Sequence, residues 1–479
     1  MPDMPKTATA SQTLDRDAVG FWQLTYQSIS LIAPAGAMAA TLTGAAVYAQ
    51  GALPLAMLAG VITAGLMINT TLQFSKSIAS AGGFYSYIAH GLGSRWAVYG
   101  AFLFLISYFN ILTNATVFVG GVFLPGVLHH FLGITSPGWL WWPVTLLFYG
   151  AVLLLALKGI RPSLRYAVWT GTAEIVVLLV LSVLLIIRSP HSMTWEVLNP
   201  LWAKGGLSGF GHGVLIAMFA VSGSSAAVAL GEETQSPQKR IRRAVIAAFL
   251  FSSVLFLLMA YALTVAWGYT RMGSFARSLV PGAILVEEVL HSPVLAWLVL
   301  LLIANSMLAG SLAPLLSCAR MIFALGRDGV VFPERLGQTD TRRNPSQALI
   351  VTTLGAATLS LCTGFWLGPF HGYILLITLS SLGLFLGHIL ANCALGPFSR
   401  RTAQSHWLFH WVIPTMASLL IAAAMILTLV PLSARLTLAP LFILFTLGIV
   451  WLRLRRASPE KIAAAGRFNV IDEISSPPL

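Results

Sequence analysis

One acidic residue stands alone inside a long apolar stretch of the sequence. Of the 15 Asp and Glu residues, only Glu174 falls near the middle of such a stretch, nine residues after Arg165. An ionised carboxylate is costly in apolar surroundings, so the group must be neutral, paired or in contact with water. Such a carboxyl group is suited to exchanging a proton or coordinating a cation. The alternative is a protonated glutamate that hydrogen-bonds a neighbouring carbonyl and has only a structural role.

Two segments of small residues interrupt apolar runs that are otherwise suited to helices. Residues 33–36 read APAG and residues 222–225 read SGSS. Proline lacks a backbone donor and glycine weakens a helix. In apolar surroundings such an interruption persists only beside protein or a hydrated cavity, where its free N–H and C=O groups bind ions or polar ligands.

The elements that position these residues follow from composition. The chain has 479 residues, of which 57% are hydrophobic and 9% are charged. Soluble proteins carry about 25% charged residues, so a soluble enzyme, a disordered chain and a secreted disulfide scaffold are all excluded. The three cysteines match no metal or disulfide spacing, and no catalytic cluster or nucleotide-binding motif is present. We expect an all-α integral membrane protein that is not an enzyme and holds no metal or cofactor.

Apolar runs long enough to cross a bilayer occur twelve times. They lie near residues 24–48, 52–74, 95–124, 138–157, 163–187, 207–231, 244–268, 293–324, 346–366, 370–396, 407–431 and 434–452. We therefore expect one domain of twelve transmembrane helices over residues 21–455, between an N-terminal tail (1–20) and a C-terminal tail (456–479). Both tails are expected to be mobile, and the long loop 269–292 to form short helices.

The basic residues orient these helices. Of the 28 Lys and Arg residues, all but five lie at one set of helix ends. The exceptions are Arg188, Lys204, Arg271, Arg277 and Arg435. Because positive charge concentrates on the cytoplasmic side, we expect both termini in the cytoplasm and the protein in the plasma (inner) membrane. The net charge of +13 then reflects contact with a lipid bilayer and not with nucleic acid.

A weak internal repeat relates the two interrupted runs. Ala33 and Gly36 recur 187 positions later as Ala220 and Gly223. Gly44 recurs at the same distance as Gly231. Residues 24–187 and 207–396 would then be inverted copies, each of five helices, with two extra helices over 407–452. The alternative is that small residues simply serve ordinary helix packing in membranes.

Three stretches resemble permeases of the amino acid–polyamine–organocation (APC) superfamily. Residues 219–244 read FAVSGSSAAVALGEETQSPQKRIRRA, residues 319–329 read ARMIFALGRDG, and residues 81–87 read AGGFYSY. The resemblance covers residues ~20–455. It implies the leucine-transporter type of 5+5 inverted-repeat fold. It also implies secondary active transport of an amino acid or related amine by alternating access, as proton-coupled symport or exchange.

The resemblance also implies a binding site at the two interruptions. The substrate carboxylate would meet residues 35–37 at the start of a half-helix, and the ammonium group would meet carbonyls near Ala33 and residues 219–222. The expected substrate-binding residues are Ala33, Pro34, Ala35, Gly36, Ala37, Tyr108, Phe219, Ala220, Val221, Ser222, Gly223 and Ser224. Two departures from the family pattern bear on recognition: Pro34 offers no N–H, and residues 222–224 lack the acid that is common there.

Coupling is assigned to Glu174 by the same resemblance, because this part of the fifth helix faces the first and eighth. We expect H⁺ as the coupling ion. Na⁺ is less favoured because Leu312 and Ala313 occupy the expected sodium positions, with the hydroxyls of Ser306 and Ser311 displaced.

Several polar and aromatic residues keep two interpretations. Tyr108 either covers the substrate or only forms hydrogen bonds between helices. Phe219 either gates the site or only packs against neighbouring helices. His212 and His388 are expected to be structural hydrogen-bond donors. The acids at 232 and 233 form an inner gate with Arg240 or Arg243, or else a solvated cluster. The whole chain keeps two alternatives as well, an organic-cation or polyamine carrier and a transport-incompetent membrane sensor of the same fold.

Overall fold

The computed structural model describes residues 13–189, 194–278, 280–403, 405–429 and 437–475. Every named element in these ranges is a helix, and the one β-bridge among them, between Val19 and Thr234, is isolated. Ten helical stretches are long and apolar enough to cross a membrane, and the shorter apolar helix α8 (Trp141–Leu157) lies among them. The predicted all-α membrane class is confirmed.

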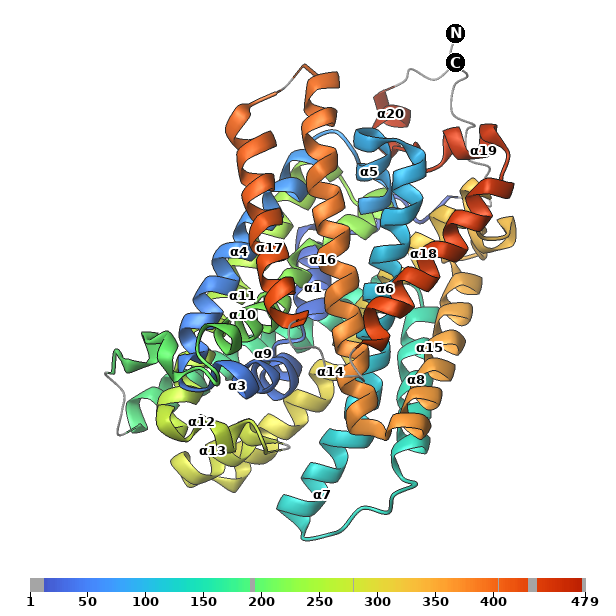
Figure 1. Cartoon of the computed structure of the whole chain (residues 1–479). Coiled ribbons are helices and arrows are strands. Elements are labelled where there is room, and N and C mark those ends of the chain that lie inside the picture. Colours follow the sequence, from blue (N-terminus) through green and yellow to red (C-terminus); the bar gives the residue numbers. More distant parts are fainter. Residues whose placement is uncertain (1–12, 190–193, 279, 404, 430–436, 476–479) are drawn as a thin grey trace.

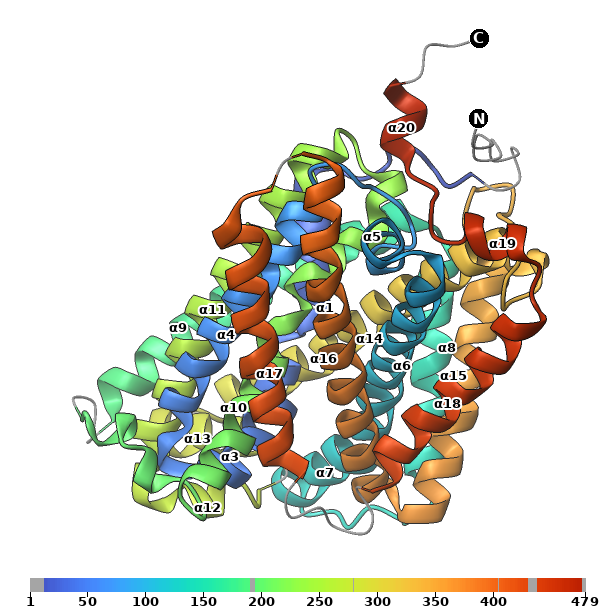
Figure 2. The ribbon, with the colours of Figure 1, turned by 45° about the horizontal axis from the view of Figure 1, so that its top comes forward.

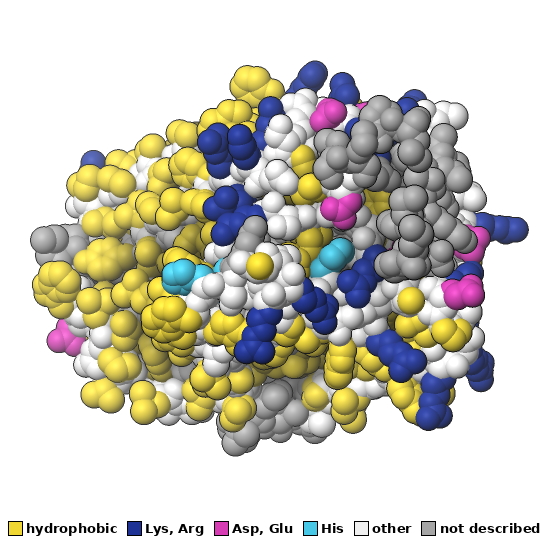
Figure 3. Space-filling view, turned by 90° about the horizontal axis from the view of Figure 1, so that it is seen from above, with side chains coloured by type: hydrophobic (Ala, Val, Ile, Leu, Met, Phe, Trp, Pro, Cys, Tyr) yellow, Lys and Arg dark blue, Asp and Glu magenta, His cyan; other side chains and the backbone are white. Residues whose placement is uncertain are grey.

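The long helices run side by side in one bundle (Figures 1 and 2). They are α4 (Leu53–Phe74), α6 (Ser94–Phe118), α9 (Ile160–Arg188), α11 (Pro237–Trp267), α14 (Pro293–Asp328), α15 (Ser346–Leu367), α16 (Pro369–Arg401), α17 (Ile413–Leu429) and α18 (Leu438–Arg456). Large apolar side chains such as Leu147 and Ile187 are 76% and 68% exposed, which suits contact with lipid. Figure 3 shows hydrophobic side chains around a face on which Lys and Arg side chains gather.

The first interruption lies where the sequence predicts it. Helix α1 (Phe21–Ile32) stops at Ala33, whose φ of 50° and ψ of 71° are left-handed. Pro34 follows as the first residue of α2 (Pro34–Ala37), and a proline disfavours the right-handed helical conformation in the residue before it. The chain continues through the π-helix η2 (Met38–Leu42) into α3 (Thr43–Ala49).

The second interruption is a change of helix type. Helix α10 (Leu207–Val221) gives way at Ser222 to a 3₁₀ helix, η7 (Ser222–Glu233). Side chains three residues apart eclipse one another in a 3₁₀ helix, and the small side chains at the start of η7 tolerate this crowding. The expected interruption at residues 222–225 is confirmed. The backbone there is not unwound, however, but forms the narrower 3₁₀ helix.

Both termini lie at one end of the bundle, here called the terminal end (Figure 1). Parts of the two tails, residues 13–20 and 457–475, contact the bundle in the structure. Val19 N–H donates to Glu233 O at 2.9 Å, and α19 (Pro459–Ala464) and α20 (Val470–Ser475) lie at the terminal end. The remaining tail residues, 1–12 and 476–479, lie outside the described ranges.

Short helices occupy the long loop at the opposite end of the bundle. They are η8 (Tyr269–Arg271), α12 (Met272–Phe275) and α13 (Pro281–Leu290). The expectation of short helices over residues 269–292 is therefore confirmed. Near them, α6 continues through the π-helix η4 (Val119–Phe123) into α7 (Leu124–Leu132).

Candidate functional site

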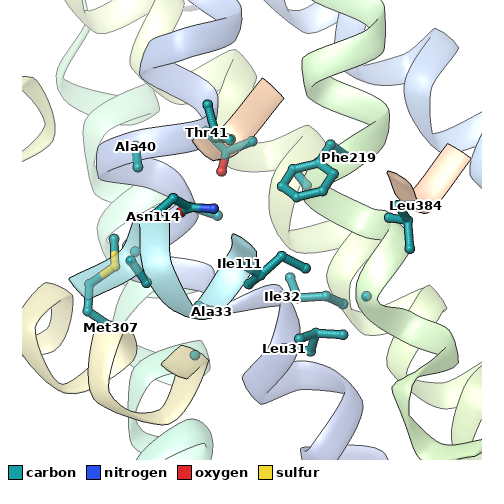
Figure 4. A pocket seen from close by; sticks show the side chains of 17 residues that line it. Leu31, Ile32, Ala33, Ala40, Thr41, Ile111, Asn114, Phe219, Met307 and Leu384 are labelled. Atoms are coloured by element: carbon teal, nitrogen blue, oxygen red, sulfur yellow. The ribbon is translucent and has the colours of Figure 1, made fainter. Parts of the chain in front are cut away.

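A cavity lies against the interruption of α1 (Figure 4). Its volume is about 70 Å³, which is enough for a small cluster of water molecules. Residues of α1, α2, η2, α6, α10, η7, α14 and α16 surround it. The lining residues are Leu31, Ile32, Ala33, Gly36, Ala37, Ala40, Thr41, Ile111, Asn114, Ala115, Phe219, Ala220, Gly223, Met307, Gly310, Ile377 and Leu384. The wall is mostly apolar, and Thr41 and Asn114 supply its polar side chains.

Half of the substrate-binding residues expected from the sequence line this cavity. They are Ala33, Gly36, Ala37, Phe219, Ala220 and Gly223. The others, Pro34, Ala35, Tyr108, Val221, Ser222 and Ser224, are buried or partly buried nearby in the chain but are not part of its wall. On α6 the wall is formed by Ile111, Asn114 and Ala115, one to two turns beyond Tyr108.

Glycines allow the helices to close around the interruption. A Cβ atom placed on Gly310 of α14 would lie 2.5 Å from Ala33 Cβ, and one on Gly223 of η7 would lie 2.9 Å from Ile32 Cγ1. Real Cβ contacts are not this short, so both positions require glycine for the observed approach. The end of α1 is thereby held between α14 and η7.

Glu174 of α9 reaches this interruption from the other side. Its side chain is 2% exposed. Its Oε1 accepts hydrogen bonds from Ala35 N–H at 2.6 Å and from Ser306 Oγ at 2.7 Å. The carboxyl group therefore lies at the N-terminal end of α2, where a helix favours negative charge.

This contact changes the set of backbone donors that face the cavity. Of the three residues expected to meet a substrate carboxylate, Ala35 donates to Glu174, and Ala37 N–H donates to Ala33 O at 2.6 Å. Gly36 lines the cavity between them, and Pro34 has no N–H. Gly36 is thus the position at the helix start that remains suited to receiving a ligand oxygen.

The orientation of the Asn114 amide is set by its neighbours. Its Nδ2 donates to Asn110 O at 2.8 Å and to Ser380 Oγ at 3.2 Å. The Ser380 hydroxyl itself donates to Leu376 O at 2.9 Å, so it is an acceptor toward Asn114. Both amide hydrogens are therefore engaged, and Oδ1 is left as an acceptor on a residue of the cavity wall.

Two buried ion pairs lie between the cavity and the terminal end. Arg320 Nε lies 2.5 Å and its Nη2 2.9 Å from the two carboxylate oxygens of Glu233, and the pair is almost fully buried. Arg327 contacts Glu232 in the same two-pronged way, at 3.0 Å twice. The prediction that Arg240 or Arg243 pairs with these two acids is therefore wrong. Helix α11 begins at Pro237 after a left-handed turn at Ser236, and α14 supplies the arginines.

The C-terminal segment contacts one of these ion pairs, that of Arg327 and Glu232. The Arg327 guanidinium lies 3.8 Å from the centre of the Phe468 ring. The neighbouring Asp328 accepts hydrogen bonds from Gly466 N–H at 2.8 Å and from Tyr85 Oη at 2.7 Å. Burial and the nearby Asp328 carboxylate raise the pKa of Tyr85 well above its usual value, so the phenol is a permanent donor. The C-terminal segment is thus part of the closure of the terminal end.

The two membrane histidines behave differently. His212 Nδ1 lies 2.7 Å from Ser208 O, as expected of a structural donor. Within the described part of the chain, neither ring nitrogen of His388 has a hydrogen-bond partner. The His388 ring packs edge-on against Phe84 and Phe104, with centroids 4.9 Å and 5.3 Å away. The expectation of a satisfied donor is therefore wrong for His388, because aromatic rings surround it.

Comparison with known proteins identifies similar chains. A family model described as amino acid permease matches residues 23–454. The branched-chain amino acid permease BcaP of Lactococcus lactis subsp. cremoris (strain MG1363) is 24% identical over 377 residues, which is 75% of this chain and 77% of that protein. BcaP of Bacillus subtilis (strain 168) is 24% identical over 344 residues, 69% and 71% of the two chains.

A solved structure shows the same fold. MhsT in complex with L-phenylalanine matches with a TM-score of 0.56 at 15% sequence identity. The match covers 84% of this chain and 98% of that chain. The arrangement of helices is therefore shared, whereas at this identity the match carries no information about individual side chains.

Proposed function

Because the chain belongs to the amino acid permease family, a family of transporters and not of enzymes, we propose that it is a secondary active transporter of an amino acid. The cavity at the α1 interruption is the binding site, and the protein works by alternating access. The observation that carries this proposal is the cavity itself. It places a helix start, an amide oxygen and an apolar wall around one small space at the centre of the bundle.

The proposed topology has twelve crossings. The stretch Phe21–Phe74 contributes two, one through α1–α3 and one through α4, and α8 contributes another. Five crossings up to α9 would then form one repeat, five from α10 to α16 its inverted copy, and α17 and α18 the additional pair. An even number agrees with both termini lying at one end (Figure 1). The concentration of Lys and Arg assigns that end to the cytoplasm and the protein to the plasma membrane.

The proposed substrate is an amino acid with a branched or long aliphatic side chain. Leu31, Ile111, Ile377 and Leu384 provide an apolar wall of matching character. The substrate carboxylate binds at Gly36 N–H, and the ammonium group at Asn114 Oδ1. The two BcaP relatives are named branched-chain amino acid permeases, which agrees with this wall. The described wall carries no acid, which disfavours an organic-cation or polyamine carrier.

Glu174 is the proposed coupling residue, with H⁺ as the coupling ion. It is buried in α9, yet it directly contacts the half-helix whose start forms the binding site. A change of its charge alters the electrostatic potential at Ala35 and one residue further on at Gly36. Ser306 donates to Glu174. A proton is favoured over Na⁺ because Leu312 and Ala313, whose side chains carry no oxygen, occupy the expected sodium positions.

Ligand-dependent thermal unfolding tests the substrate class. Purified protein in detergent is heated with each amino acid and with common amines, at two pH values, with and without Na⁺. A bound ligand raises the unfolding temperature according to its concentration relative to its dissociation constant. We expect leucine, isoleucine or valine to raise it most and lysine, glutamate and putrescine to have no effect. Silence across the whole panel would overturn the amino acid assignment.

A further inference from the structure

A hollow on the outer surface of α9 combines two arginines with two aromatic rings. Arg161, Pro162, Arg165, Tyr166 and Trp169 line it. The spacing of four residues from Arg161 to Arg165 and on to Trp169 places these three side chains in one stripe along the helix. Trp169 is 74% exposed, so the stripe faces the surroundings of the bundle.

The hollow carries more positive charge than its neighbours neutralise. Arg161 Nε lies 3.3 Å from Asp15 Oδ2, and both side chains are partly exposed, so this pair is weak. In the described ranges the Arg165 side chain has no hydrogen bond or ion pair to another protein group. The hollow therefore offers at least one guanidinium that is free to bind an anion, and an arginine fork matches a phosphate group.

The height of the hollow in the membrane matches a lipid headgroup. Asp15 belongs to the N-terminal segment, so its contact with Arg161 places the hollow at the terminal end, which we assign to the cytoplasm. Arg161 and Trp169 are separated by about 12 Å along the helix at 1.5 Å per residue. The headgroup zone on each side of a bilayer is about 5–8 Å deep. The arginines thus lie among the headgroups, and the indole reaches the upper part of the acyl chains.

The floor of the hollow is tied to the proposed coupling residue. Tyr166 Oη donates to Asn305 Oδ1 at 2.6 Å, which fixes the ring. The next residue along α14, Ser306, donates to Glu174. A molecule bound against Tyr166 therefore lies within two side-chain contacts of the residue that contacts the α1 interruption.

We propose that Arg161, Arg165, Tyr166 and Trp169 form a binding site for the phosphate headgroup of an anionic phospholipid in the cytoplasmic leaflet. The guanidinium of Arg165 binds the phosphate, Arg161 adds a second cation, and Trp169 packs along the glycerol backbone and first acyl carbons. The lipid holds Tyr166 and, through Asn305, the segment of α14 that bears Ser306. The site rests on the proposed orientation of the bundle but not on the identity of the transported amino acid.

Lipid-dependent thermal unfolding tests the site. Full-length protein in detergent is heated with phosphatidylglycerol or with phosphatidylcholine of the same acyl chains. We expect phosphatidylglycerol to raise the unfolding temperature of the wild type more than phosphatidylcholine does. The double variant Arg161→Ala/Arg165→Ala loses most of this difference. Equal effects of the two lipids on the wild type, or an unchanged difference in the double variant, would overturn the proposal.

Controls separate the site from general basicity and from free phosphate. Arg455→Ala/Arg456→Ala removes two arginines of α18, one of them already stacked on Trp451 at 4.0 Å, and is expected to keep the lipid response. Trp169→Ala keeps both charges and is expected to lose part of the response. Inorganic phosphate alone is expected to have no effect, and if it reproduces the shift the lipid assignment is wrong. A leucine response in phosphatidylcholine, measured on the same samples, reports separately on the proposed function.

Discussion

Glu174 Oε1 accepts a hydrogen bond from Ala35 N–H at 2.6 Å, so an acid of α9 holds the start of the half-helix that follows the break in α1. The contact joins two residues that are 139 positions apart in the sequence. A buried carboxylate gains stability at a helix start when it is charged, and loses that gain when it takes up a proton. We therefore expect protonation of Glu174 to be linked to the position of α2.

The first prediction concerns this contact. Glu174→Gln keeps an acceptor for Ala35 but removes the titratable charge. We expect uptake into proteoliposomes to fall about tenfold or more, as for loss of one charged hydrogen bond, and to stop responding to an imposed pH gradient. Ser306→Ala is the matched control, because it removes the other hydrogen bond but keeps the carboxyl group, and it should retain the response. Full pH dependence in the glutamine variant would exclude proton coupling at Glu174.

The second prediction concerns the buried pair of Glu233 and Arg320. Glu233→Gln leaves a guanidinium with 0% exposure short of its counter-ion. We expect a loss of about 3–5 kcal/mol in the free energy of unfolding. A double-mutant cycle with Arg320→Met should give a coupling of about 2 kcal/mol or more. The exposed pair of Lys461 and Glu334 is the control and should couple by less than about 1 kcal/mol. Equal coupling in the two pairs would contradict the buried arrangement.

The third prediction concerns the C-terminal segment. Deletion of residues 457–479 removes the Phe468 ring from Arg327 and the Gly466 N–H from Asp328. We expect the terminal end to open more often. A cysteine placed at Ser317, which is fully buried on α14 one turn before Arg320, should be alkylated more than about fivefold faster in a background without native cysteines. Deletion of residues 476–479 alone keeps every described contact and should leave the rate unchanged. Equal alkylation rates in the two deletions would show that the segment does not hold this end closed.

The fourth prediction concerns the size of the cavity. Ala220 is 3% exposed and lines the wall, so Ala220→Leu fills part of the space. We expect leucine affinity to fall about tenfold or more while alanine affinity changes less than about threefold, because the smaller ligand needs less volume. Isothermal titration measures both. Cys362→Leu, a comparable replacement at an exposed position of α15, serves as the control. An equal loss of affinity for both ligands would show that the substrate does not bind in this cavity.

The interruptions could be predicted from sequence because their cause is local. Pro34 acts on Ala33, its direct neighbour, and small residues mark the start of η7. The isolation of Glu174 was visible for the same reason. Its partners Ala35 and Ser306 were not, because they lie more than a hundred residues away in the chain and only packing brings them together.

The cavity wall shows where sequence reasoning stops. Ile377 and Leu384 lie seven residues apart on α16 and therefore share one face of the helix. From sequence alone this apolar face cannot be distinguished from one that contacts lipid. Asn114 carried a usable signal, a polar residue within an apolar run. The partners of the acids at the end of η7 were assigned to arginines close in sequence, whereas the buried Arg320 and Arg327 come from α14.

Uptake of labelled leucine into proteoliposomes that contain the purified protein tests the central claim most directly. We predict saturable uptake that isoleucine and valine inhibit, that lysine and glutamate do not inhibit, and that needs about tenfold or more leucine for half-saturation in Ala220→Leu, which stays folded. Uptake no faster than in protein-free liposomes, or uptake that lysine but not isoleucine inhibits, would contradict the assignment of the α1 cavity as a site for an aliphatic amino acid.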